Sequence, residues 1–258
     1  MPVLKISLPG SQLLRASLLV AGLSLLAGCG AAPGPDAIND PFETTNRKVH
    51  AFNRGVDRML LGPTSKGYGR IVPKPVSLAI GNLADTLDLP GDIANNLLQF
   101  RIGAAAQNTM RLATNVIFGV GGLIDTSTAF GLEGRPTDFG ETLHVWGFGE
   151  GPYLEVPLAG PSTVRDAAGT VVDFAMNPLR LALPKREATA ATAIKLLSRV
   201  GDRDRFRETI ESILYDSADS YAQARLLYLQ NRRFVLAGGA GSTSEEDYID
   251  PYEDPYAE

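Results

Sequence analysis

The chain has 258 residues, of which 24 are lysine or arginine, 29 are aspartate or glutamate, and one, Cys29, is cysteine. A lone cysteine excludes an internal disulfide and a multi-cysteine metal site. Seven carboxylates and no cation lie in the last 17 residues, so the body before them is nearly neutral and offers no basic patch for nucleic acid.

The first 28 residues have the order of a secretory signal peptide. Lys5 and Arg15 precede the apolar run Ala16–Ala27, which is too short to span a bilayer. The run closes on Leu26-Ala27-Gly28-Cys29, which resembles the bacterial lipobox, where the cysteine thiol takes a diacylglycerol before cleavage. We therefore predict lipidation at Cys29, and an ordinary secreted protein with a stray cysteine is the alternative. Gly30 follows in place of aspartate, which by resemblance to lipoprotein sorting rules favours the outer membrane.

Residues 29–39 are rich in glycine, proline and alanine and are interpreted as a flexible tether. A single domain is predicted over residues 40–237. Its first helix should begin with Asp40 as N-cap and Pro41 in the first helical position, and it should end near Leu61 because Gly62-Pro63 follows. Phe42 and Phe52 belong to one apolar stripe of this helix.

The middle of the chain is predicted as two short helices, 76–87 and 92–101, followed by a charge-poor helical hairpin over 103–132 that turns at its glycines. Asn108, Arg111 and Asn115 recur at spacings of three and four, so they share one helical face. This polar stripe is expected either to line a polar passage or to pack against other helices. Neither arm of the hairpin is long enough to cross a bilayer, so contact with lipid would come from one side.

Residues 133–161 are dense in glycine, proline and aromatic residues and are predicted to form a shaped loop without regular elements. Trp146, Phe148 and Tyr153 in this loop are either interfacial anchors or ordinary packing. Further helices are expected at 162–176, 187–200 and 203–236, the last with a bend near Ser217–Ser220. Since no segment alternates as a strand does, the fold class is mainly α. The acidic tail, 238–258, is expected to be disordered and solvated, with a docking segment as the alternative.

Known catalytic motifs are missing from the sequence: it contains no G-x-S-x-G elbow, no phosphate-binding loop and no H-E-x-x-H. His50 lies on the first helix. His144 lies near Asp138 and Glu141, which leaves a Ser-His-Asp assembly through His144 open on composition. Because no nucleophile is identified, we predict neither catalysis nor a cofactor or metal.

Four stretches, in this order, resemble one family, the VacJ/MlaA phospholipid-transport lipoproteins. They are Asp40-Pro41-Phe42-Glu43 with Asn46-Arg47 and Phe52-Asn53; Asn95–Gln99; the block from Asp138 through Gly151-Pro152-Tyr153 to Pro161; and Tyr228-Leu229-Gln230 with Arg232-Arg233. Arg165-Asp166, just after the block, also fits.

This resemblance implies a ring-shaped helical body in the periplasmic leaflet of the outer membrane, with a polar central channel. Phospholipids misplaced in the outer leaflet would pass through it to a soluble periplasmic carrier, a trimeric porin would hold the ring, and lipid asymmetry would be maintained. Asn108, Arg111 and Asn115 are the candidate channel lining. A periplasmic lipid hydrolase and a non-transporting structural lipoprotein stay open as alternatives.

Overall fold

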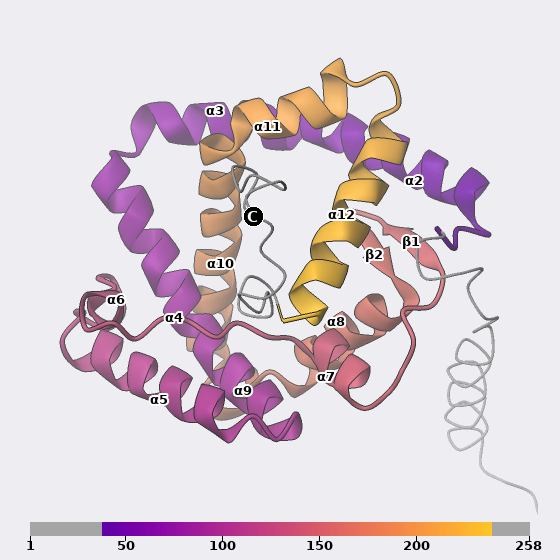
Figure 1. The fold of residues 1–258 in the computed structure, drawn as a ribbon. Helices are drawn as coiled ribbons and strands as arrows, with labels where there is room; N and C mark the ends of the chain where they lie inside the picture. The colour runs from indigo at the N-terminus through magenta and orange to yellow at the C-terminus, as the bar shows by residue number, and fades with distance from the viewer. Residues whose placement is uncertain (1–37, 239–258) are drawn as a thin grey trace, which may run out of the picture.

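The computed structural model describes residues 38–238. Cys29, the predicted signal peptide, most of the tether and nearly all of the acidic tail lie outside the described residues. The described part is mainly α-helical, with one two-stranded antiparallel sheet, and its elements follow one another around a ring (Figure 1). The predicted fold class, a mainly α single domain, is confirmed.

The ring begins with one continuous arc made of α2 (Glu43–Val56), the π-helical segment η1 (Asp57–Leu61) and α3 (Gly62–Ile71). The predicted end at Gly62-Pro63 is wrong. The backbone N–H of Gly62 bonds the carbonyl of Asp57, five residues back, and this change of register leaves Pro63 in the first turn of α3. A proline costs no hydrogen bond there, so the helical path continues.

The predicted capping of the first helix is also wrong. Helix α2 starts at Glu43, later than expected, and no side chain caps it. The Asp40 carboxylate instead accepts a hydrogen bond from the side chain of Asn46 (2.9 Å) and binds the Tyr221 hydroxyl and the Arg225 guanidinium. Asp40 therefore joins the two ends of the described chain rather than starting a helix.

A single long helix, α4 (Lys74–Leu98), replaces the two short helices that were predicted, and Pro90 lies inside it. Helix α4 packs against both α5 (Ile102–Ile117) and α10 (Lys185–Arg205), and these contacts compensate for the backbone hydrogen bond that Pro90 cannot make. The hairpin predicted over 103–132 is corrected too. Its second arm contains only α6 (Thr126–Ala129), and the helix against which α5 folds back is α4.

The glycine-rich block is more regular than predicted. It contains α7 (Phe139–Val145) and a hairpin of β1 (Tyr153–Val156) and β2 (Gly160–Thr163), in which Tyr153 faces Thr163 and Val156 faces Gly160. The Asp138 carboxylate caps α7 by accepting a hydrogen bond from the Glu141 N–H (2.8 Å). Four-residue strands are too short to show an alternating pattern in sequence.

The last part of the ring contains α8 (Val164–Met176), α9 (Pro178–Ala182), α10, α11 (Arg207–Glu211), the π-helical η2 (Ser212–Asp216) and α12 (Ser220–Leu236). The expected end of α8 at Asn177 and the expected interruption near Ser217 are confirmed. Helix α10 passes through Gly201, where an end was predicted, because Gly201 is buried beside Ser77 and Tyr68.

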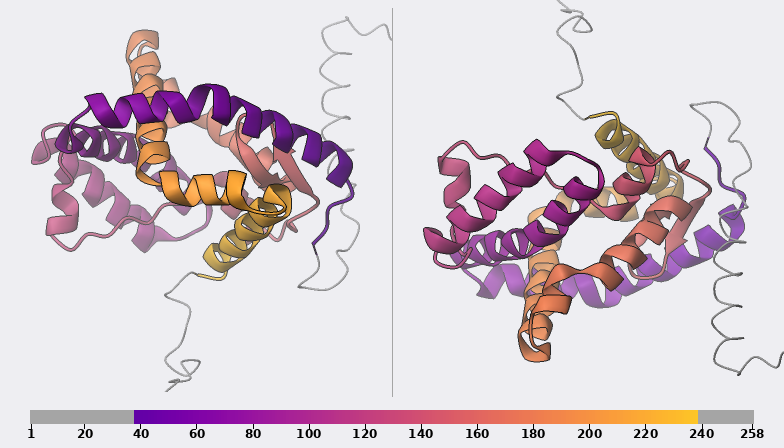
Figure 2. Two further views of the ribbon diagram at one scale, coloured as in Figure 1. Left: turned by 90° about the horizontal axis from the view of Figure 1, so that it is seen from above. Right: turned by 90° about the horizontal axis from the view of Figure 1, so that it is seen from below.

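Helix α10 crosses the ring, and one end of it projects beyond the other helices (Figure 2). It is fixed to the opening arc by an ion pair in which the Arg203 guanidinium donates to both Asp57 carboxylate oxygens, at 2.8 and 2.9 Å. The Tyr215 hydroxyl adds a third hydrogen bond to Asp57 (2.8 Å). This cluster positions α10 as an inner wall of the ring.

Burial in this fold is inverted relative to that of an ordinary water-soluble domain. Among the described residues, seven hydrophobic residues are buried against twenty-one polar or charged ones, while thirty-five large hydrophobic side chains are exposed. The helices share this pattern: on α2, Asn46 and His50 are buried and Phe52 is exposed. Within the described residues, a small hydrophobic cluster of Tyr153, Tyr221 and Leu229, with Tyr228 packed against it, forms the core.

Candidate functional site

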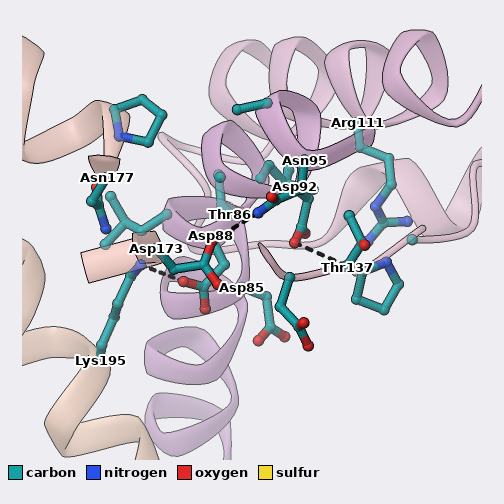
Figure 3. A pocket seen from close by; sticks show the side chains of 18 of the residues that line it. Asp85, Thr86, Asp88, Asp92, Asn95, Arg111, Thr137, Asp173, Asn177 and Lys195 are labelled. Carbon is teal, nitrogen blue, oxygen red and sulfur yellow. Dashed lines mark hydrogen bonds and ion pairs between the residues drawn. The ribbon is translucent and has the colours of Figure 1, made fainter. Parts of the chain in front are cut away.

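A cavity of about 640 Å³ lies between α4, α10, the junction of α8 and α9, and the segment 134–139, with two residues of α5 in its wall (Figure 3). Its volume lies within the range of small-molecule sites. Six carboxylates and three cations line it: Asp85, Asp88, Asp92, Asp125, Asp138 and Asp173, with Arg111, Lys195 and Arg199. The wall therefore combines apolar surface with charged groups and has an excess of negative charge.

Three of these carboxylates come from one face of α4. Asp85, Asp88 and Asp92 are separated by three and four residues, which places them one above another on a helix. Asp88 forms an ion pair with Lys195 of α10, and Asp92 accepts a hydrogen bond from the Thr137 N–H (3.2 Å). The spacing of this acidic face is visible in the sequence, but it was missed because the helix was predicted to break at residues 88–91.

Burial changes the titration of these carboxylates. It raises the pKa of Asp92 to about 7, because the Thr137 hydrogen bond only partly offsets desolvation and the neighbouring Asp88 adds repulsion. Burial also raises the pKa of Asp85, with repulsion from Asp88 contributing. Asp173 has a raised pKa, chiefly from burial, although it accepts hydrogen bonds from Asn95 (2.8 Å) and from the Phe139 N–H (2.9 Å).

The predicted polar stripe of α5 faces the interior. Asn108, Arg111 and Asn115 are all buried; Arg111 and Asn115 line the cavity, and Asn108 is not part of its wall. The Asn108 amide exchanges two hydrogen bonds with the backbone of Arg135 (2.8 and 3.0 Å), and the Asn115 side-chain oxygen accepts from the N–H and hydroxyl of Ser127 (3.0 and 2.9 Å). The stripe therefore holds the segment that returns along α5, and its role in a lipid route stays a prediction.

Two of the family-motif residues, Asn46 and Asn53, act together on strand β1. Asn46 donates to the Tyr153 carbonyl (3.1 Å) and accepts from the Glu155 N–H (3.0 Å); Asn53 does the same with the Val156 carbonyl (3.0 Å) and the Leu158 N–H (2.7 Å). Asn46 and Asn53 are two helical turns apart, a rise of about 10 Å, which is close to the length of three residues in a strand. The two amides therefore pair with β1 as a neighbouring strand would.

The remaining motif residues join distant parts of the ring. Asp166 accepts hydrogen bonds from Arg232 (3.0 and 3.1 Å) and the Tyr228 hydroxyl (2.7 Å), and Arg165 donates to it (3.2 Å). At Gly151 φ is +72°, which favours glycine, and the next carbonyl, that of Pro152, accepts from the Val164 N–H (3.0 Å). Ten motif positions lie away from the cavity wall: Asp40, Pro41, Phe42, Asn46, Asn53, Gly151, Pro152, Tyr153, Arg165 and Asp166. The same stretches also contribute Asn95, Leu98, Asp138 and Phe139 to the wall.

The histidines differ from the sequence expectation. His144 is exposed at the end of α7, and no hydrogen bond to its imidazole occurs in the part of the chain that the structure describes. His50 instead lies between the Glu155 carboxylate (3.2 Å) and the Ser220 hydroxyl (3.0 Å). Two features oppose a nucleophilic role for Ser220: the residue is buried, and Arg54 already donates a hydrogen bond to its hydroxyl (3.3 Å).

Comparison with known proteins gives a consistent result. The model of the MlaA lipoprotein family matches residues 38–235. The intermembrane phospholipid transport system lipoprotein MlaA of Haemophilus influenzae is 32% identical over 244 residues, 91% of this chain and 96% of that protein, and the Escherichia coli K12 protein of the same name is 30% identical over 253 residues, 95% and 94%. A solved structure concerning the maintenance of bacterial outer membrane lipid asymmetry superposes with a TM-score of 0.65 at 27% identity, covering 76% of this chain and 98% of that one. None of the helices within residues 38–238 combines the length and hydropathy needed to cross a membrane.

Proposed function

This chain belongs to the MlaA lipoprotein family, and from that premise we propose that it removes misplaced phospholipids from the outer leaflet of the outer membrane and returns them toward the cell interior. In this proposal Cys29 carries the lipid anchor and the ring lies in the periplasmic leaflet. Headgroups pass through the polar cavity, a soluble periplasmic carrier receives the lipid, and a trimeric porin holds the ring. The chain makes and breaks no bond.

The observation that carries the proposal is the inverted burial. On α5, Met110, Val116 and Ile117 are exposed while Asn108 and Asn115 are buried. Helix α8 repeats the pattern: Val171 and Phe174 are 68% and 65% exposed, and Asp166 is buried. Each square ångström of apolar surface kept from water contributes roughly 25 cal/mol, so these faces favour acyl chains as their surroundings.

The interior supports passage of the polar end of a lipid. A charged headgroup that loses water without finding polar partners costs several kcal/mol. The cavity supplies such partners as carboxylates, amides and guanidinium groups from α4, α5, α8 and α10. The carrier and the porin rest on the family resemblance alone.

The proposal is tested by filling the cavity. Ala94 lines the cavity, and Ala94→Trp should block it without removing a polar contact; Ala106, exposed on α5, gives the matched control Ala106→Trp. Both variants should be present in the outer membrane at the normal level. In cells that depend on this protein, Ala94→Trp should then raise the amount of surface-exposed phospholipid as much as deletion of the gene does, and Ala106→Trp should not raise it. Normal lipid asymmetry in the Ala94→Trp strain would contradict the proposal and favour a purely structural lipoprotein.

Hydrogen bonds link Ser220 to His50 and His50 to Glu155, an arrangement that favours a second candidate function, a lipid hydrolase. Its test is the release of fatty acid from phospholipid vesicles by the purified protein. If the protein is a hydrolase, the unsubstituted chain should release fatty acid and the Ser220→Ala variant should not. Because Ser220 is buried and its hydroxyl oxygen already accepts a hydrogen bond from Arg54, we expect no release from either protein.

A further inference from the structure

Part of the negative charge in the cavity is not in an ion pair with a cation of the described residues. Lys195 pairs with Asp88, and Arg111 pairs with Asp125 at 3.1 Å. Within the described residues, Asp85, Asp92 and Asp173 form no ion pair. Figure 3 shows Asp85, Asp88, Asp92 and Asp173 gathered around one space from α4 and α8. These carboxylates would gain from a cation supplied by a ligand.

A metal ion fits this arrangement poorly. In the part of the chain that the structure describes, no three acidic, histidine or cysteine groups converge closely enough to hold one. The carboxylates are spread along two turns of α4 and across to α8, a spacing that suits a larger cationic group. The ammonium of a lipid headgroup can hydrogen-bond one of these carboxylates at a time while the others attract it through space.

A second observation concerns Arg111, which is only 9% exposed and lines the same cavity. Its Nη atoms bind Asp125, Thr128 and the Leu132 carbonyl, but its buried Nε–H has no acceptor among the described residues. A Cβ at Gly134 would lie 3.7 Å from that Nε, so a side chain at this position would pack directly against the unpaired edge of the guanidinium. An unsatisfied guanidinium N–H is a donor for a phosphate oxygen.

Arg111 and the acidic face of α4 line the same cavity, so both can act on one bound molecule. Burial raises the pKa of Asp85 and Arg111 opposes that increase, so its positive charge lies within electrostatic range of Asp85. Asp125, bound to Arg111, is also near enough to add repulsion. The cavity therefore offers a donor for an anion and acceptors for a cation on neighbouring walls.

We infer that the cavity selects phospholipids with a zwitterionic, primary-ammonium headgroup, in which Arg111 Nε binds the phosphate and Asp85, Asp92 and Asp173 bind the ammonium. A headgroup with phosphate but no ammonium would leave the carboxylates unpaired and would be repelled by them. This inference rests on the proposed function and names the substrate class of the same cavity.

The experiment compares two soluble probes, dihexanoyl phosphatidylethanolamine and dihexanoyl phosphatidylglycerol, by calorimetric titration of the full-length protein in detergent. The unsubstituted protein should bind the ethanolamine lipid at least about tenfold more tightly. The double variant Asp85→Asn, Asp92→Asn should lose about tenfold in affinity for that lipid and none for the glycerol lipid. Asparagine at 92 can still accept from Thr137, so folding should survive, as circular dichroism will show. Glu208→Gln, which removes an exposed carboxylate of α11 away from the cavity, is the control and should change neither affinity.

The outcomes separate the two claims. Equal affinity for both lipids, or an unchanged affinity for the ethanolamine lipid in the folded double variant, overturns the headgroup inference and leaves the transport proposal standing. If neither lipid binds, the transport proposal and the headgroup inference are both overturned.

Discussion

The surroundings of Asp92 disfavour the ionised form of its carboxyl group, and this changes the free energy of unfolding with pH. Its pKa is raised by burial from an ordinary value near 4 to about 7, so the folded state binds the proton more tightly than the unfolded state does. Stability is therefore lost as pH rises from about 4 to about 7, and the loss persists above pH 7.

Asp92→Asn removes this ionisation and keeps an acceptor for the Thr137 N–H. The variant should be more stable than the unsubstituted protein at pH 8, by at most about 4 kcal/mol, and equally stable near pH 4. Unfolding by denaturant in detergent at both pH values measures the difference, with Glu208→Gln as control. A stability difference that is the same at both pH values would mean that Asp92 titrates normally.

At the residue scale, spacing alone predicted part of the site. Asn108, Arg111 and Asn115 do share one buried face, as their spacing of three and four residues indicates. The same spacing at Asp85, Asp88 and Asp92 was not recognised, because Pro90 suggested a helix break. Which polar groups meet across α4, α5 and α10 depends on the ring, and no local pattern contains that information.

The contact between α7 and α8 depends on two glycines. A Cβ at Gly169 would lie 2.3 Å from the Gly140 nitrogen and 2.6 Å from its Cα, so Gly169→Ala must push the two backbones apart. We expect a loss of about 3 kcal/mol in the free energy of unfolding. Gly81→Ala on α4 is the matched control: nothing lies within 4 Å of the new methyl group, and helix propensity should give a gain of about 0.5 to 1 kcal/mol. Equal stability of the two variants would show that α7 can move freely away from α8.

The return segment after α5 depends on two amides. Asn108→Leu leaves the Arg135 N–H without a partner and leaves the Arg135 carbonyl with only the hydrogen bond from the Asn96 side chain (3.2 Å). Asn115→Leu leaves the Ser127 N–H without a partner. Each substitution should cost about 1 to 3 kcal/mol, whereas Ala106→Leu, exposed on the same helix, should be nearly neutral. Thermal unfolding of the three variants measures these differences in stability. Unchanged stability in both asparagine variants would mean that these residues face a lipid route without supporting the fold.

Helix ends were the least predictable feature at the element scale. Pro63, Pro90 and Gly201 are all residues that end isolated helices, and each lies within a helical path here. The reasons are tertiary: a π-helical turn shifts Pro63 into a first-turn position, packing on two sides holds α4 together at Pro90, and Gly201 fits against α3 and α4. The break at Ser217 was predictable because it comes from local capping by Asp219.

At the scale of the whole molecule, the sequence showed amphipathic helices without showing which face is inside. An apolar stripe and a polar stripe are equally visible whether the helix packs in water or in lipid. In this ring the polar stripes of α2 and α5 face inward. The surrounding medium decides the direction, and that information enters only when the helices close around a polar interior.

The outward apolar faces give the last prediction. Ile117, at the end of α5, is 69% exposed, so Ile117→Asp should leave the fold and its unfolding temperature unchanged in detergent. In a bilayer the same carboxylate would be placed among acyl chains at a cost of several kcal/mol. Flotation with phospholipid vesicles, carried out in a Cys29→Ala background so that an acyl anchor cannot mask the effect, should show at least about a tenfold loss of binding. Thr209→Asp, at an exposed position on α11, is the control, and this variant should float with the vesicles as the parent protein does. A folded Ile117→Asp ring that binds vesicles as well as its parent would place the lipid surface on other helices and would remove α5 from the membrane contact.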